Sequence, residues 1–351
     1  MPKRNYWSRK QLFDTGADYL IAFGQNASGK SYQGKLECVE RALRGERFFF
    51  LKRWKEDIKQ TIANNYFDDI PISKLTKGEW ERITAWQGYY YFARLNDKGE
   101  LEKSDVIGAY GALNEWQRYK SNVYVNYTFL LFEEFISKDV YLNDEPLTLH
   151  RLITTIFRDH KGQVLMLGNT ISRTVPYFLE WTPNVIKQKQ GTIEIYHMKD
   201  FSGEGNDVDI AVEYTGHIKG SNLMAFGNAS KSIKAGEWSV ENHPKLPKDH
   251  IDYEKVYELM IKYQQFAFVV ELLIDWEEGT RLVFVYPRTT NREIERVITD
   301  EFSDKPNVSR YFKSERKSEQ HIMDCIANER MCFSDNLTAT DFLSVIKMLD
   351  I

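Results

Sequence analysis

Short apolar runs alternate with longer polar stretches through the first two hundred residues. Four runs, at 18–23, 47–52, 127–132 and 163–167, are rich in aliphatic and aromatic residues and are typical of strands buried on both faces of a parallel sheet. A stretch with helical spacing, 30–43, joins the first run to the second. The pattern therefore predicts an α/β fold that begins with a right-handed βαβ unit.

An antiparallel insertion is expected before the third run. Residues 81–113 alternate Thr, Tyr, Phe and Ile with other residues, and the alternation is broken by Gln87-Gly88 and by Asn-Asp-Lys-Gly at 96–99, which are hairpin signals. A further strand is expected at 192–197. Residues 1–200 are thus predicted to form one domain, a mostly parallel sheet flanked by helices with an antiparallel insertion.

The composition shifts after residue 200. Glycine and proline are frequent from 201 to 247, which is typical of a linker or lid region. The last segment, 248–351, is predicted to be a small α+β domain. Its expected elements are an amphipathic helix from Tyr253 to Tyr263, a hairpin formed by 266–274 and 280–286, and two helices near 315–328 and 339–349.

Length, charge and cysteine content narrow the classes of protein. The 351 residues suggest two domains at roughly 150 residues each. A net charge of −4 means that any contact with nucleic acid is local. Three cysteines without a CxxC pair argue against a disulfide framework or a Cys-ligated zinc site. No run approaches 18 apolar residues and the first ten are polar, so a membrane or exported protein is not expected.

A phosphate-binding loop follows the first predicted strand. The stretch GQNASGKS matches GxxxxGK[ST] between a strand and a helix, as this motif requires. Its backbone N–H groups and the helix N-terminus would cradle the phosphates of ATP, its lysine would neutralise their charge, and its serine would bind Mg²⁺. The residues predicted to bind the nucleotide are Gly24, Gln25, Asn26, Ala27, Ser28, Gly29, Lys30, Ser31 and Tyr32.

Acidic and polar residues end two later strands. Glu133 and Glu134 follow the run FLLF, and since neighbours on an extended chain point to opposite sides, Glu133 is predicted to bind the metal and Glu134 to orient the attacking water. The metal-side acid is usually aspartate, so Glu133 is a departure from the pattern. Asn169 ends the strand at 163–167 and is placed to sense the γ-phosphate, or else to cap the next helix.

Arg158 precedes the predicted strand at 163–167. It is a candidate arginine finger supplied to a neighbouring subunit, although an arginine in such a place is often part of a surface ion pair.

These motifs together resemble a known family. The loop GQNASGKSY, the segment 48–55, the segment 120–135 and the segment 156–185 occur in this order and resemble the genome-packaging ATPase of small short-tailed phages, the phi-twenty-nine type motor, over about residues 10–200. The resemblance implies an additional-strand, catalytic-glutamate (ASCE) P-loop ATPase. It also implies that Arg158 is the finger, that Lys55 acts on a neighbouring subunit, and that Lys120 is a weaker candidate for the same boundary.

The resemblance also implies partners and a location. The family forms a homopentameric ring on the phage portal in the host cytoplasm and drives double-stranded DNA into a procapsid. Its C-terminal domain resembles an RNase H-type nuclease without a metal site and docks on a structural RNA. Glu271 and Asp275 do not complete a cluster of acids here, so no nuclease activity is expected. The candidate DNA contacts are Arg53, Lys55, Lys187, Lys189, Lys231 and Lys234.

Two other functions stay open from the residues alone. A P-loop kinase acting on a small acceptor would not need the acid pair at 133 and 134. A weakly active nucleotide-binding scaffold is compatible with the Glu133 departure. A GTPase would require NKxD and an ABC-type ATPase LSGGQ, and the sequence contains neither.

Overall fold

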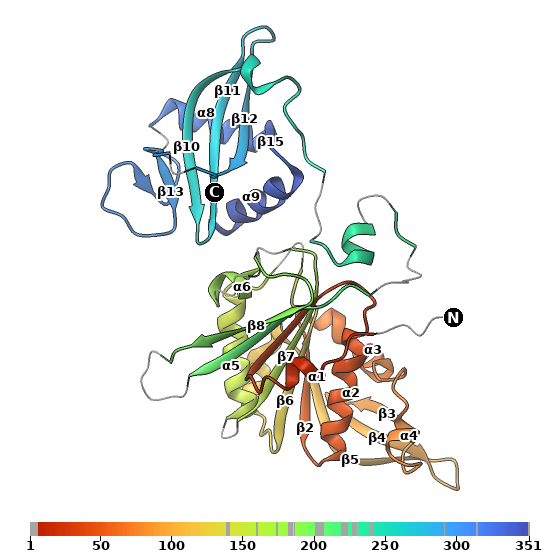
Figure 1. Cartoon of the computed structure of the whole chain (residues 1–351). Helices are drawn as coiled ribbons and strands as arrows, with labels where there is room; N and C mark the ends of the chain where they lie inside the picture. The colour runs from red at the N-terminus through yellow and green to blue at the C-terminus, as the bar shows by residue number, and fades with distance from the viewer. Residues whose placement is uncertain are drawn as a thin grey trace. The chain divides into compact units, whose positions relative to one another are not determined.

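The chain folds into two compact units, which are described separately. The computed structural model describes residues 6–137, 141–158, 161–172, 175–181, 185, 187–200, 207–218, 224–226, 230–238, 242–290, 292–313 and 315–349. Unit 1 comprises Met1–Ser239 and unit 2 comprises Val240–Ile351 (Figure 1). In the described ranges, none of the helices has the length and apolar character needed to cross a bilayer.

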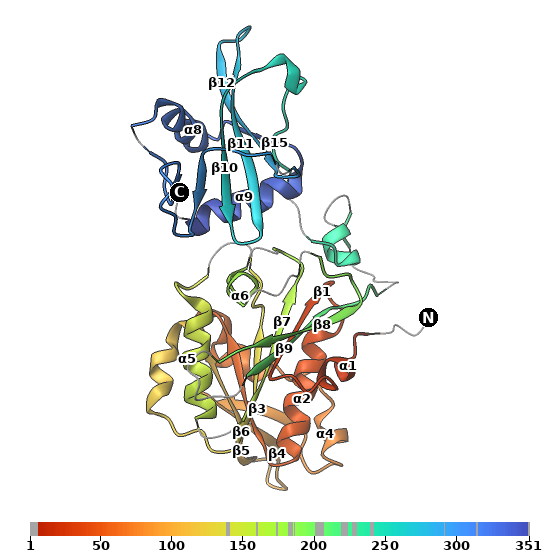
Figure 2. The ribbon, with the colours of Figure 1, turned by 60° about the vertical axis from the view of Figure 1, so that its left-hand side comes forward.

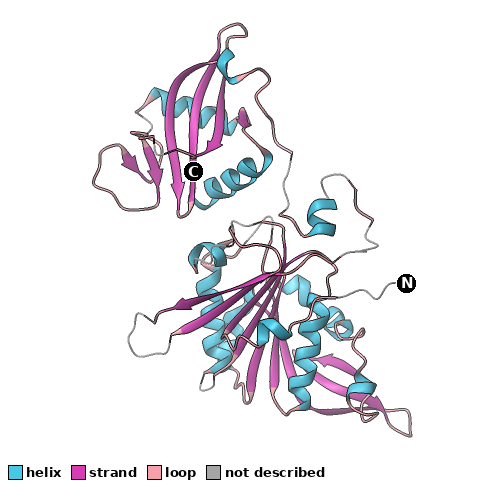
Figure 3. Cartoon of the chain, viewed as in Figure 1, coloured by secondary structure: helices cyan, strands magenta, loops and turns pink. Residues whose placement is uncertain are grey.

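Nine strands of the described part of unit 1 form one mixed sheet, in the order β3-β4-β5-β2-β6-β7-β1-β9-β8. Figure 3 shows strands in magenta and helices in cyan. Neighbours from β5 to β9 are parallel, whereas β3-β4-β5 and β8-β9 are antiparallel. The strands are β1 (Tyr19–Gly24), β2 (Arg47–Lys52), β3 (Arg82–Trp86), β4 (Tyr89–Leu95), β5 (Leu101–Ala112), β6 (Tyr127–Glu133), β7 (Gln163–Asn169), β8 (Thr192–Met198) and β9 (Val208–Tyr214).

Two long helices cover opposite faces of this sheet (Figure 2). Helix α2 (Lys30–Leu43) packs on the face that carries Leu131 and Leu167, and α5 (Glu145–Phe157) packs on the other. The shorter helices of unit 1 are α1 (Lys10–Phe13), η1 (Lys55–Ile58), α3 (Gln60–Asn65), α4 (Ile72–Leu75), η2 (Leu113–Ser121), α6 (Pro176–Glu180) and η3 (Lys231–Ala235).

The strand predictions for unit 1 are confirmed, including the antiparallel insertion β3-β4-β5. Strands β1 and β2 are not neighbours, however, because β7 and β6 lie between them. Register then sets the site: Gly24 at the end of β1 pairs with Asn169 of β7, and Glu133 at the end of β6 pairs with Leu167 of the same strand. The phosphate loop and the acid pair therefore meet at one edge of the sheet.

The domain boundary differs from the predicted one. Residues 208–214, which the sequence assigned to a linker, form β9 between β1 and β8, so the described part of 201–238 belongs to unit 1. Residues 201–206, 219–223, 227–229 and 239–241 of the predicted linker lie outside the described residues.

Unit 2 is α+β, as expected, but its first element is a strand. The segment predicted as an amphipathic helix, Tyr253 to Tyr263, forms β10 instead, paired antiparallel with β11. The sheet order is β14-β13-β10-β11-β12-β15. The elements are η4 (His250–Asp252), β10 (Glu254–Tyr263), β11 (Phe266–Asp275), β12 (Thr280–Pro287), β13 (Val297–Thr299), β14 (Val308–Ser309), α8 (Lys317–Ala327), β15 (Met331–Phe333) and α9 (Asn336–Leu349).

Candidate nucleotide site

The loop between β1 and α2 has the backbone of a phosphate cradle. Gly24, Ala27 and Gly29 have φ of 152°, 51° and 93°, and Gly29 is the N-cap of α2. A Cβ added to Gly24 would lie 2.1 Å from Oγ1 of Thr215, so only glycine fits there. The loop borders an open hollow of about 380 Å³, lined by Tyr6, Ala27, Ser28, Gly29, Lys30, Ser31, Tyr32 and Asn169.

Lys30 is folded back onto the loop that carries it. Its side chain is 6% exposed, and Nζ donates to the carbonyl oxygens of Gln25 (2.7 Å) and Gly24 (3.4 Å) and to Oγ of Ser28 (3.1 Å). Burial lowers the pKa of Lys30 from 10.5 to about 7. These three partners of the Lys30 ammonium group are neutral oxygens, and a bound phosphate would supply an anionic partner. The geometry therefore favours an anionic ligand.

Both flanks of the loop are tied to other parts of unit 1. On one side, the Trp7 backbone N–H donates to the Ser28 carbonyl (2.9 Å) and its indole N–H donates to Glu213 Oε1 (2.8 Å). On the other side, the Gln25 side chain accepts from the Ile218 N–H (2.8 Å) and donates to its carbonyl (3.2 Å). Gln25 therefore anchors the loop to the segment after β9 through its side chain, a role that the motif does not predict.

The acid pair lies at the end of β6 beside a lysine that sequence reasoning missed. Glu133 is 5% exposed, and since it is two residues after Leu131 it faces α2. Glu134 is exposed and has φ of 59°. Lys52, the last residue of β2, lies 3.3 Å from the Glu133 carboxylate and 3.1 Å from that of Glu134. Only the strand order of the sheet brings this lysine to the acids.

Arg53 is a structural residue, and its prediction as a DNA contact is wrong. Its guanidinium is buried and pairs with Glu145 at 2.8 Å. It also donates to the backbone carbonyls of Glu134 (3.2 Å) and Phe135 (2.6 Å). The hydroxyl of Tyr177 donates to the same Glu145 carboxylate at 2.8 Å. This buried network fixes the backbone that carries the predicted catalytic glutamate.

Asn169 lies beside the phosphate loop. It pairs with Gly24 in register and lines the hollow around Lys30. Helix α6 begins only at Pro176 with Val175 as its N-cap, so the alternative of a helix cap does not hold. This position fits the predicted contact with the γ-phosphate.

Arg158 lies near the amino-terminal end of β7, at the opposite end of this strand from Asn169 and the phosphate loop. It is the exposed C-cap residue of α5, and the preceding Phe157 ring contacts Gly162, just before β7 begins. The seven residues of β7 then lead to Asn169, a distance of about 20 Å. Arg158 is therefore far from the phosphate loop of its own chain.

Neither Lys55 nor Lys120 lines the hollow at the phosphate loop. Lys55, just after β2, pairs with Glu115 at 2.9 Å. Lys120 lies in η2, with Nζ 4.1 Å from the centroid of the Trp116 ring. Within one chain, both side chains have local partners instead.

The donor atoms at this edge fit a magnesium ion. Ser31 offers an exposed hydroxyl, and Oε2 of Glu133 lies 3.3 Å from Nζ of Lys52, so a cationic group already lies beside this carboxylate. Mg²⁺ takes oxygen ligands and is held in nucleotide sites by one or two protein groups together with phosphates and waters. Ser31 and Glu133 are the residues that would hold the ion.

The acids singled out in unit 2 are already engaged. Glu271 accepts from Tyr286 (2.9 Å) and lies 2.7 Å from His250, and Asp275 pairs with Lys248 at 2.8 Å. Each carboxylate therefore has a local structural partner.

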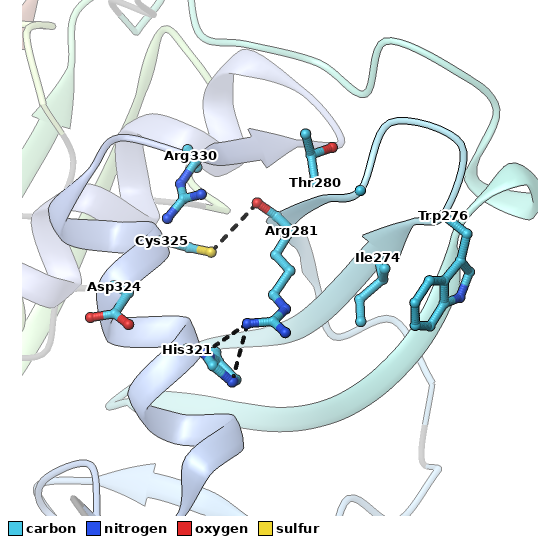
Figure 4. A pocket seen from close by; sticks show the side chains of 9 residues that line it. Ile274, Trp276, Thr280, Arg281, His321, Asp324, Cys325 and Arg330 are labelled. Carbon is cyan, nitrogen blue, oxygen red and sulfur yellow. Dashed lines mark hydrogen bonds between the residues drawn. The ribbon is translucent and has the colours of Figure 1, made fainter.

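A hollow of about 380 Å³ lies in unit 2 between β12, α8 and β15 (Figure 4). Arg281 and Arg330 line it from different elements, and Arg281 Nη1 lies 3.3 Å from the ring nitrogens of His321. Exposed Trp276 borders the same hollow, and Asp324 adds one acid. Cationic and aromatic side chains thus gather at one place in this unit.

The fold and the site define a class of protein. A phosphate loop and an acid pair sit at the same sheet edge, with one additional strand, β7, between the strands that carry them. This is the arrangement of an ASCE P-loop ATPase. A family model described as podovirus DNA encapsidation protein (Gp16) matches residues 1–229, and the chain belongs to this family.

Individual relatives agree with this assignment. The DNA packaging protein of Bacillus phage PZA is 24% identical over 321 residues, which cover 87% of this chain and 86% of the relative. That of Bacillus phage B103 is 30% identical over 203 residues, covering 55% and 58%. Among solved structures, the bacteriophage Phi-29 genome packaging motor assembly shares the fold with a TM-score of 0.55 and 19% identity, covering 98% of this chain and 99% of that chain. The chain is thus a phage DNA-packaging ATPase.

Proposed function

We propose that this protein hydrolyses ATP at the interfaces between identical subunits of a ring, and uses the energy to move double-stranded DNA through the portal into a procapsid. The supporting observation is the position of Arg158, at the sheet edge opposite Lys30 and the acid pair. A finger so placed can complete only a neighbour's site. The family membership supports the packaging role and disfavours the kinase alternative.

In this mechanism, Lys30 and the loop amides bind the phosphates, and Ser31 and Glu133 are the residues that would hold Mg²⁺. The ion would neutralise charge on the transferred phosphoryl group. Glu134 orients the attacking water, and Asn169 contacts the γ-phosphate. Lys52 neutralises both acids when no cation is bound.

The proposal extends to the partners that the resemblance implies: a pentameric ring at the portal vertex in the host cytoplasm, double-stranded DNA and a structural RNA. Lys187, Lys189 and Lys231 are exposed, which supports a phosphate contact in unit 1. The hollow lined by Arg281 and Arg330 supports a phosphate contact in unit 2. Filter binding with double-stranded DNA and with a folded RNA, for the parent and the doubly substituted Arg281→Ala, Arg330→Ala protein, separates the two nucleic acids.

The strand arrangement of unit 2 supports the proposal that this unit is an inactive RNase H-type domain. Strand β11 is antiparallel to both of its neighbours, β10 and β12, and β13 runs parallel to β10 and to β14. Because Glu271 and Asp275 are bound by local partners, we propose that this unit does not cleave nucleic acid. Cleavage of a plasmid in Mg²⁺ or Mn²⁺, abolished by Glu271→Gln, would contradict this proposal.

Steady-state ATP hydrolysis with and without double-stranded DNA tests the motor. Turnover of the parent should be stimulated by DNA, and Glu134→Gln should reduce it at least about 100-fold with nucleotide binding retained, because general-base groups contribute that much. Full activity in Glu134→Gln would contradict the assignment. No turnover in the parent would leave the scaffold alternative instead.

A mixing experiment tests the finger. Arg158→Ala keeps an intact phosphate loop and Lys30→Ala keeps an intact Arg158, so a mixture of the two inactive variants should recover part of the activity. The matched control is Lys161→Ala, an exposed cation at the same sheet edge, which should remain active alone. No recovery at any ratio would overturn action between subunits.

A further inference from the structure

The glutamate at position 133 leaves one oxygen without a partner. Oε2 lies 3.3 Å from Nζ of Lys52, but Oε1 is buried and accepts no hydrogen bond from any described residue. A buried carboxylate oxygen without a donor is costly, and such atoms in native proteins call for an explanation. Glutamate also has one more side-chain torsion than the aspartate usual at this place, so its carboxylate is harder to fix.

Tyr66 lies on the same face of the sheet as Glu133. Its ring stacks on Phe50 of β2, with centroids 3.9 Å apart and planes at 22°. Phe50 pairs in register with Leu131, and Glu133 projects from the same face of β6 as Leu131. The Tyr66 hydroxyl is itself buried and has no hydrogen bond of normal geometry. A donor and an acceptor, both unpaired, are thus neighbours beneath α2.

The electrostatics agree with this proximity. Burial raises the pKa of Tyr66 well above 10, and the neighbouring Glu133 carboxylate raises it further. The phenol therefore stays protonated at neutral pH and can act as a donor.

We propose that Tyr66 is a positioning residue for Glu133. Its hydroxyl donates to the carboxylate and fixes the rotamer of this longer acid, so that the remaining oxygen is presented to the divalent cation of the bound nucleotide. The inference rests on the proposed function, since it assigns Glu133 to that cation. It explains how a glutamate serves at a position where aspartate is usual.

The first test is cation affinity in Tyr66→Phe, which keeps the stacking on Phe50 and removes one oxygen. Mn²⁺ binding is measured by electron paramagnetic resonance with a non-hydrolysable ATP analogue present. Loss of an outer partner of a metal ligand typically weakens metal binding at least about tenfold, and that is the expected change. Binding of the analogue without metal should not change. The control is Tyr90→Phe, which also removes a buried unpaired hydroxyl and should leave Mn²⁺ affinity unchanged.

The second test is coupling between the two residues. In Glu133→Asp the carboxylate is one methylene further from Tyr66, so adding Tyr66→Phe should not weaken Mn²⁺ binding again. Parental affinity in Tyr66→Phe, an equal loss in Tyr90→Phe, or an undiminished effect of Tyr66→Phe in the aspartate background would each overturn the inference. If the parent bound no metal–nucleotide complex, the proposed function would fail as well; normal binding in both parent and Tyr66→Phe would refute the role of Tyr66 alone.

Discussion

The buried pair of Arg53 and Glu145 gives a quantitative prediction. Glu145 is 0% exposed and accepts from the Arg53 guanidinium, the Tyr177 hydroxyl (2.8 Å) and the Leu142 N–H (2.9 Å). Glu145→Gln would leave the Arg53 charge buried without a counter-ion and turn an amide NH₂ toward one of three donors. Removing one partner of a buried pair costs about 3–5 kcal/mol, against a total stability of about 5–15 kcal/mol for a domain.

Urea unfolding followed by tryptophan fluorescence measures this cost in unit 1, which contains seven of the eight tryptophans. Replacing both partners, as Arg53→Met with Glu145→Leu, removes the unpaired charge and should cost clearly less than the two single changes added together. A loss below about 1 kcal/mol for Glu145→Gln, or full additivity in the double variant, would refute the reasoning. The single variant should also lower ATP turnover, because Arg53 holds the Glu134 carbonyl.

Three further changes test the surroundings of the phosphate loop. Gly24→Ala places a Cβ 2.1 Å from Oγ1 of Thr215 and should weaken binding of a fluorescent ATP analogue at least about tenfold; parental affinity would contradict the clash. Burial raises the pKa of Glu213, so the parent protein loses stability as the pH rises above 4.5, the ordinary pKa of a glutamate. Glu213→Gln removes this charge and keeps the bond to Trp7. The variant should therefore unfold at a higher urea concentration than the parent at pH 7.5, but not at pH 4. Gln25→Leu removes both bonds to the segment after β9 and should speed its amide hydrogen exchange, with no change expected at unit 2.

The error at β10 shows why one element could not be predicted from its own residues. Val256, Leu259, Met260 and Tyr263 have spacing that suits a helix as well as a strand. The strand is selected by its ten-residue partner β11 across a tight turn in which Gln264 has φ of 50°. No Gly, Asn or Asp marks this turn, so the hairpin leaves no local signal in the sequence.

Local chemistry determined the phosphate loop and the core strands of unit 1. The motif from Gly24 to Ser31 specifies its own backbone, and apolar runs as dense as those of β2 and β6 are typical of buried strands between two helical layers. The order of those strands is not local information. The strand order depends on which faces pack together. Only this order brings Lys52, at the end of β2, beside the acid pair at the end of β6. Folding likewise places Tyr66, which follows α3, against Phe50 of β2. The sequence by itself thus determined the reacting groups, and the tertiary structure decided their neighbours, because contacts between distant segments are set by burial and register across the whole sheet.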